Sequence, residues 1–249
     1  MIIIVKVPFS SGSLGKNIGC EKTPGILINK LNYKNLNVKE VKIYENNLDL
    51  THENIFNAEG DVFIGGDHSL TFSSFGSLEG RNKGLIIFDA HPDLEIGTKS
   101  VTHEDYLRKL IDNNYLKKEN LVLIGIRKIS QNEYKFLKEN RIKFYTTEQI
   151  FDFGIKNICE DVMEYLNKLD ALYLSIDIDV LDPAFAPGTG YREPFGLGNI
   201  ELLYILKRVL KLRNVKRVDL VEINPDNDFN EITINTGLEI LKLFLDRFK

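Results

Sequence analysis

The chain has 249 residues, of which 43% are apolar and 27% charged, and its 32 basic and 36 acidic side chains leave a net charge of −4. Such a composition excludes disorder, and the balanced charge excludes the basic field that binding to nucleic acid requires. The apolar runs are far shorter than the ~20 residues that span a bilayer, the first of them lacks the basic region and cleavage site of an export signal, and the only cysteines, Cys20 and Cys159, fit a reducing cytoplasm.

Short apolar runs alternate along the chain with longer stretches of helical periodicity, the pattern of βαβ units around a parallel sheet. The expected strands are residues 2–7, 40–44, 61–64, 84–89, 120–126, 142–145, 171–177 and 216–223. The expected helices are residues 103–116, 132–140, 155–169, 200–212 and 231–248. Several strands are apolar without alternation, so both of their faces are covered. We predict an α/β fold with a mostly parallel sheet of about eight strands, in one domain that spans residues 1–249.

Acidic and imidazole side chains gather where three of the predicted strands end. They are His68, Asp89, His91, Asp93, Asp177 and Asp179. The aspartates and His91 recur at a spacing of two, which extended backbone points to one side, and Gly65 and Gly66 permit a tight turn before His68. Ligands of open α/β sheets bind outside the carboxyl ends of the strands, so we expect these side chains to meet there.

Buried carboxylates this close together repel one another unless cations neutralise them, and two divalent ions cancel four negative charges. Mixed imidazole and carboxylate ligands suit first-row metals, and an oxygen-rich set favours manganese over zinc. Two ions about 3.5–4 Å apart can share a water and lower its pKa toward ~7. One Asp-x-His-x-Asp segment alone could equally be a turn with satisfied side chains, but the coincidence of three segments favours a paired-metal site.

Four segments resemble the signatures of the ureohydrolase family, the arginases and agmatinases. They are residues 65–69 (Gly-Gly-Asp-His-Ser), 89–93 (Asp-Ala-His-Pro-Asp), 175–190 and 221–225 (Val-Glu-Ile-Asn-Pro). The resemblance implies an arginase-like, three-layer α/β/α fold and a centre of two Mn²⁺ ions that hydrolyses a small guanidino substrate to urea and an amine. It also implies that the metal ligands are His68, Asp89, His91, Asp93, Asp177 and Asp179.

Three residues are expected to serve in catalysis. Glu222 follows the last strand, where its carboxylate could accept two parallel hydrogen bonds from a guanidinium. His103 matches a family histidine that passes protons, here to the departing amine, and imidazole titrates in the range for that duty. Asp93 is expected to act in catalysis as well as in metal binding. The alternative, non-catalytic roles are a structural ion pair for Glu222 and a helix-capping or solvent-facing position for His103. His52 is expected on the surface.

Two segments depart from the family pattern, so the substrate tail is where the sequence is least informative. Residues 94–105 match neither the arginase nor the agmatinase loop, and residues 191–196 carry Tyr191 and Arg192 where relatives have Thr-Pro and a glycine pair. We expect Tyr191 or Arg192 to line the entrance and bind substrate, and a guanidinium there would prefer a substrate that bears a carboxylate. The alternative is that Arg192 points to solvent.

The leading hypothesis is a binuclear manganese hydrolase of a guanidino compound, agmatinase-like and so connected with polyamine metabolism. The same metals could instead serve an arginase or a hydrolase of guanidino acids or formimino compounds. A hypothesis from a different functional class is a metal-binding scaffold without catalytic activity. Homo-oligomers are common in the family and expected here, although nothing in the sequence sets the subunit number.

Overall fold

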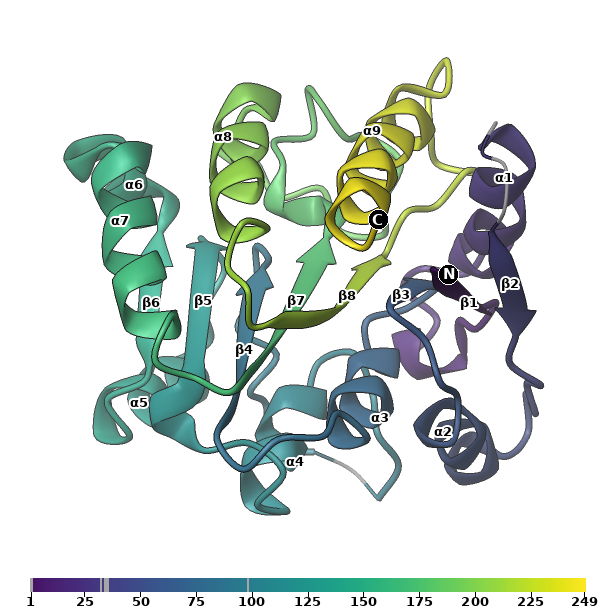
Figure 1. The fold of residues 1–249 in the computed structure, drawn as a ribbon, viewed down its shortest axis with the longest axis horizontal. Helices are drawn as coiled ribbons and strands as arrows, with labels where there is room; N and C mark the ends of the chain where they lie inside the picture. Colours follow the sequence, from purple (N-terminus) through teal and green to yellow (C-terminus); the bar gives the residue numbers. More distant parts are fainter. Residues whose placement is uncertain (1, 32, 34–35, 98) are drawn as a thin grey trace.

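The architecture is described by a computed structural model for residues 2–31, 33, 36–97 and 99–249. Within these residues one sheet of eight parallel strands runs in the order β2-β1-β3-β8-β7-β4-β5-β6 (Figure 1). The strands are β1 (Ile3–Val7), β2 (Asn37–Glu40), β3 (Val62–Gly65), β4 (Lys83–Phe88), β5 (Leu121–Ile126), β6 (Lys143–Thr146), β7 (Ala171–Asp177) and β8 (Val215–Val221).

Helices cover both faces of the sheet, which confirms the three-layer α/β/α prediction (Figure 1). One face carries α1 (Thr23–Lys30), α6 (Thr147–Phe153), α7 (Ile155–Leu166), α8 (Asn199–Val209) and α9 (Ile232–Arg247). The other face carries α2 (Leu48–Phe56), α3 (Leu70–Gly76), α4 (Tyr106–Asp112) and α5 (Gln131–Glu139). None of the helices in the described part of the chain is long and apolar enough to cross a membrane.

The central strands are apolar without alternation because each face of the sheet packs against a helical layer. In β7, which is buried along its whole length, Leu172 and Leu174 belong to the core under α7, α8 and α9. Tyr173 points the opposite way, into the core under α3 and α4. The sheet is thus held from both sides, which makes its carboxyl edge a rigid platform.

The predicted strand at residues 40–44 is wrong in position, because β2 is Asn37–Glu40 and pairs with β1 from Asn37 to Glu40. As an edge strand it exposes most of its side chains, so apolar periodicity gave no signal there. Val41, which suggested a strand, instead packs as a buried side chain just beyond it.

The other differences concern helices. Three short ones, α1, α3 and α6, were not expected, and the helix predicted at residues 103–116 is the shorter α4. His103 therefore lies in the turn before α4 and not in its first turn. His52 was expected on the surface, but it lies in α2 with 5% of its area exposed, packed edge-on against Phe9 and Phe72.

A candidate binuclear metal centre

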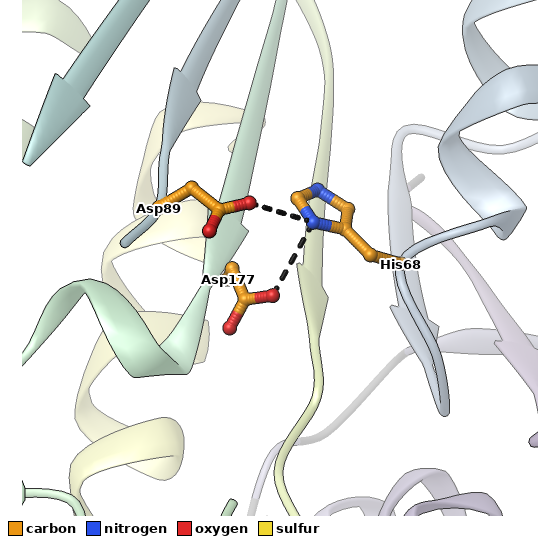
Figure 2. A group of neighbouring side chains, drawn as sticks. All are labelled: His68, Asp89 and Asp177. Carbon is orange, nitrogen blue, oxygen red and sulfur yellow. Dashed lines mark ion pairs between the residues drawn. The ribbon is translucent and has the colours of Figure 1, made fainter. Parts of the chain in front are cut away.

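Four neighbouring central strands, β3, β8, β7 and β4, end at one edge of the sheet, and the predicted ligands follow them. Gly66 allows the first of these turns, since a Cβ on Gly66 would lie 1.8 Å from the carbonyl oxygen of Phe9. Figure 2 shows the result, with the imidazole of His68 directed at two carboxylates. Its Nδ1 lies 3.0 Å from Oδ2 of Asp89 and 3.3 Å from Oδ2 of Asp177.

A second group of ligand atoms lies beside the first and shares Asp89 with it. Nδ1 of His91 lies 3.1 Å from Oδ2 of Asp179 and 3.5 Å from Oδ1 of Asp89. The two oxygens of Asp89 thus face different imidazoles, as a carboxylate between two cations would. Asp93 joins the first group, with its Oδ2 3.3 Å from Nδ1 of His68. The structure therefore brings all six predicted ligands together.

Backbone N–H groups orient three of the carboxylates. The N–H of His91 donates to Oδ1 of Asp89 (2.7 Å), and the N–H of Asp179 donates to Oδ1 of Asp177 (2.8 Å). The N–H of Ala90 donates to Oδ1 of Asp179 (3.1 Å). One oxygen of each carboxylate is thus anchored by the backbone, and its Oδ2 lies beside an imidazole Nδ1. The anchored Oδ1 of Asp89 also lies 3.5 Å from Nδ1 of His91.

Two hydroxyls lie beside Nε2 of His68, that of Ser175 at 2.8 Å and that of Tyr106 at 3.0 Å. The Ser175 hydroxyl donates to Oδ1 of Asp219 (2.6 Å), so its oxygen accepts from Nε2–H of His68. This arrangement leaves the lone pair of Nδ1 facing the carboxylates. Nδ1 of His68 and Oδ2 of Asp89 are both buried and have no hydrogen-bond partner among the described residues. A cation between them satisfies both atoms, so the residues present fit a metal.

The buried negative charge of the site also favours the binding of cations. Burial, together with the charge of Asp89, raises the pKa of Asp93 to about 8. Burial and the charges of Asp179 and Asp89 raise the pKa of Asp177 well above its usual range. Burial alone would lower the pKa of His68, but the neighbouring carboxylates of Asp177, Asp89 and Asp93 outweigh it and raise that pKa. This cluster of carboxylates therefore stabilises positive charge, whether as protons on the imidazoles or as metal cations.

Glu222 follows β8 with a φ of +64°, a left-handed conformation that few side chains adopt without support. Its N–H donates to the carbonyl of Gly66 (2.8 Å), and its Oε1 accepts from the N–H of His68 (2.7 Å). Nδ1 of His103 lies 3.4 Å from the same Oε1. The backbone strain is therefore maintained by contacts that place a carboxylate beside the metal ligands.

His103 is 5% exposed, so the structure does not support a solvent-facing role. Its N–H donates to the carbonyl of Gly12 (3.0 Å). Burial lowers the pKa of the imidazole, but the contact with Glu222 outweighs this effect and raises the pKa to about 9. Its Nε2 is buried, without a hydrogen-bond partner among the described residues, and His103 lines the cavity over the site.

Asn17, from the loop after β1, is a site residue that the sequence did not reveal. Its amide nitrogen donates to Oε2 (2.6 Å) and to the main-chain carbonyl (3.0 Å) of Glu222. Its Oδ1 accepts from Asn224 (2.7 Å), which fixes the orientation of the amide. Nothing in the local pattern predicts that residues about two hundred positions apart meet. Asp219, in contrast, is a charged residue inside an apolar run, and this pattern could have marked it as a buried partner of the site.

A cavity of about 280 Å³ opens above this cluster. Among the predicted site residues, His91, Asp93, His103, Asp177, Asp179, Tyr191 and Glu222 line it. Arg192 does not line it: it is exposed, and its guanidinium donates to the carbonyls of Pro187 (2.8 Å) and Asn227 (3.1 Å). This geometry gives no support to a substrate contact by Arg192. Thr98, in the atypical segment at 94–105, lies outside the described residues.

Comparison with known proteins agrees with this geometry. The profile of the Arginase family matches residues 28–245. An arginase of Staphylococcus aureus (strain COL) is 33% identical over 244 residues, which are 90% of this chain and 81% of the relative. A formimidoylglutamase of Halalkalibacterium halodurans is 34% identical over 192 residues, 74% of this chain and 60% of the relative. Across the Staphylococcus aureus arginases the chain spans 66 to 81% of the relative's length.

Among solved structures, the formimidoylglutamase of Bacillus subtilis superposes with a TM-score of 0.92 over 100% of this chain and 87% of that chain, at 23% identity, which shows the shared fold. The fold and the site define a metal-dependent hydrolase of the α/β class. The chain belongs to the arginase family. The resemblance seen in the sequence is thus confirmed, and the reading as a non-catalytic scaffold gains no support.

Proposed function

We propose that this protein is a binuclear manganese hydrolase that cleaves a C–N bond of a small guanidino compound to give urea and an amine. Agmatine is the first candidate substrate, and arginine and guanidino acids are the alternatives. The observation that carries the proposal is the pair of ligand groups that share Asp89, because an unpartnered imidazole nitrogen and an unpartnered carboxylate oxygen are buried face to face there.

The donor set favours two divalent ions of the manganese type, since it holds more carboxylate oxygens than imidazole nitrogens. His68, Asp89, Asp93 and Asp177 would hold one ion, and Asp89, His91 and Asp179 the other. When bound, such a pair supplies a water molecule that loses its proton near neutral pH, with a pKa of ~7.

Glu222 would orient the substrate. Its Oε1 already faces the N–H of His68 and Nδ1 of His103, and its Oε2 accepts from Asn17, so one of the about four acceptor positions of the carboxylate stays open, on Oε2. This position suits one N–H donor of a guanidinium, and the charge-assisted contact would hold its carbon near the metal ligands.

His103 would give the proton that the departing amine needs. With a pKa of about 9 the imidazole is protonated at neutral pH. Its Nδ1 side faces Glu222, so Nε2–H is the donor left for the substrate nitrogen. Asp93 forms an ion pair with His68 and, among the described residues, none with His103 or Glu222, so we assign it to metal binding first.

The test is a screen for urea release by manganese-loaded protein with agmatine, arginine and guanidino acids. Release of urea from one of them, lost after dialysis against a chelator and restored by Mn²⁺ more than by Zn²⁺, is the expected result. If no guanidino compound yields urea while the protein holds two ions, the proposal fails.

A second candidate is hydrolysis of a formimino compound, favoured by the similarity to the Halalkalibacterium formimidoylglutamase. The product separates the two candidates, because an amidine without the third nitrogen yields formamide in place of urea. Homo-oligomeric assembly, the cytoplasmic location and a single domain remain predictions, which light scattering, fractionation and limited proteolysis would test.

A further inference from the structure

The outer wall of the cavity carries more negative than positive charge. Its ionisable side chains, apart from those already assigned to the metals and the reaction, are Glu95, Glu104, Lys128, Glu133 and Glu193. Glu133 is engaged in structure, because its oxygens accept from the N–H groups of Leu94 (3.1 Å) and Ser130 (2.9 Å) and cap α5. Three carboxylates and one ammonium remain available to a substrate.

Two of these carboxylates lie close to the reaction centre. Oε1 of Glu104 is 3.9 Å from Nε2 of His103, and Oε1 of Glu193 is 3.8 Å from Nε2 of His91. Their side chains are 42% and 24% exposed, so they meet both the cavity and solvent. Neither Oε2 of Glu104 nor the carboxylate of Glu193 accepts a hydrogen bond from the part of the chain that the structure describes.

Tyr191 lies between the two histidines. Its ring centroid is 5.1 Å from that of His91 and 5.8 Å from that of His103, on which it stacks at 24°. Its hydroxyl donates to Oε1 of Glu104 (3.1 Å), which fixes both side chains. An aromatic face beside carboxylates is a common arrangement for recognition of an organic cation.

A second, independent observation points to a ligand in the same place. Nε2 of His103 is buried, has no hydrogen-bond partner among the described residues, and His103 lines the cavity next to Glu104. A nitrogen of this kind needs a polar partner. The reacting nitrogen of a substrate would satisfy it, with the rest of that substrate passing along Tyr191 toward the wall.

On the basis of the proposed guanidino hydrolysis, we propose that Glu104, Glu193 and Tyr191 form a tail site that selects substrates ending in an ammonium group and rejects those ending in a carboxylate. The alkyl chain lies along the Tyr191 ring, and the ammonium lies between the two carboxylates. A tail carboxylate would face both of them, with Lys128 as the one lysine or arginine of the described lining to offset the repulsion. This preference is the opposite of the one expected from Arg192.

Ligand binding tests the tail site separately from turnover. Isothermal titration of manganese-loaded protein compares 1,4-diaminobutane with ornithine and with 4-aminobutyrate, which share the terminal amine. We expect the diamine to bind about tenfold more tightly than either carboxylate-bearing ligand. Glu104→Gln and Glu193→Gln should each weaken the diamine about three- to tenfold and leave 4-aminobutyrate unchanged or tighter.

Two further variants make the result decisive. Glu148→Gln removes the same charge from an exposed position of a neighbouring depression and should leave diamine affinity unchanged. Lys128→Met should weaken 4-aminobutyrate and not the diamine. Equal binding of the three ligands, or Gln variants at 104 and 193 that behave like Glu148→Gln, would overturn the tail site.

Urea release distinguishes a failure of this inference from a failure of the proposed function. If agmatine, arginine and 4-guanidinobutyrate are cleaved with the same KM, and the Gln variants leave each KM unchanged, the reaction stands and the tail site falls. If the diamine binds as expected but no guanidino compound yields urea, the tail site stands and the reaction falls. The expected result is a raised KM for agmatine in both Gln variants with kcat nearly constant.

Discussion

The floor and the outer wall of the cavity differ in how they are built. The floor consists of strand-end carboxylates and imidazoles that backbone N–H groups orient, and Asp89 in it is 1% exposed. The wall consists of glutamates from loops, and the Glu104 side chain is 42% exposed. Rigid elements therefore hold the residues proposed for the chemistry, while exposed loops hold those proposed for the choice of substrate.

The comparison predicts that substitutions in the floor lower turnover or metal affinity, and that substitutions in the wall change KM between substrates. Asp89→Asn should have the largest effect, because the residue belongs to both ligand groups. We expect loss of bound manganese and about a 10³-fold fall in kcat. Metal analysis after gel filtration and urea release measure the two effects.

The matched control is Asp152→Asn, which removes an exposed carboxylate from α6 and should change neither quantity. Full manganese content in Asp89→Asn would contradict the assignment of a shared ligand.

His103→Gln should lower kcat by about 10²-fold, the usual contribution of a positioned proton donor. The pKa of His103 is raised to about 9, so the donor form is present below that pH and is lost as pH rises through it. The parent enzyme should therefore lose activity above pH 9, and the variant should show no such decline. A parent profile that stays flat to pH 10 would contradict this role, and unchanged manganese content in the variant is the control.

Ser175→Ala tests whether floor ligands depend on the groups behind them. The substitution removes the nearer of two hydroxyls beside His68 Nε2 and one donor to Asp219. Partners of this kind are worth about 10- to 100-fold in metal affinity. Competition with a chelator should show that loss. Ser74→Ala removes a buried hydroxyl from the same network without touching His68 and should cost less.

The residues of the floor could be predicted from the sequence because their positions depend on the residue pattern within each strand. Strands β4 and β7 are mostly apolar, and a period of two along their ends already implies a shared direction for the ligands. The misplaced strand β2 and the missed helix α3, rich in Ser and Phe, show the limit. Both form through packing against neighbours and not through a periodic pattern of their own.

The residues that support the metal ligands could not be predicted from the sequence, for a different reason. Asn17 meets Glu222 across 205 positions, and Ser175 meets His68 across 107, so no spacing in the sequence reports either pair. His52 illustrates the same point, because its polar neighbours in sequence concealed a buried position between two aromatic rings. Charge on the wall was visible as composition, but only the fold shows which glutamates face the substrate.

Arg127 connects the two regions and offers the smallest and most informative test. Its guanidinium donates to the carbonyls of Asp179 (2.6 Å) and Leu181 (3.2 Å) in the floor, and of Glu193 (2.9 Å) and Pro194 (3.1 Å) in the wall. Arg127→Lys keeps the charge but cannot reach both sets, since lysine has no planar fork of donors. We expect KM for the preferred substrate to rise about threefold and manganese affinity to change less, because backbone N–H groups still orient the Asp179 carboxylate. An equal fall in metal affinity and substrate affinity would show that floor and wall are one unit, and would break the distinction between them.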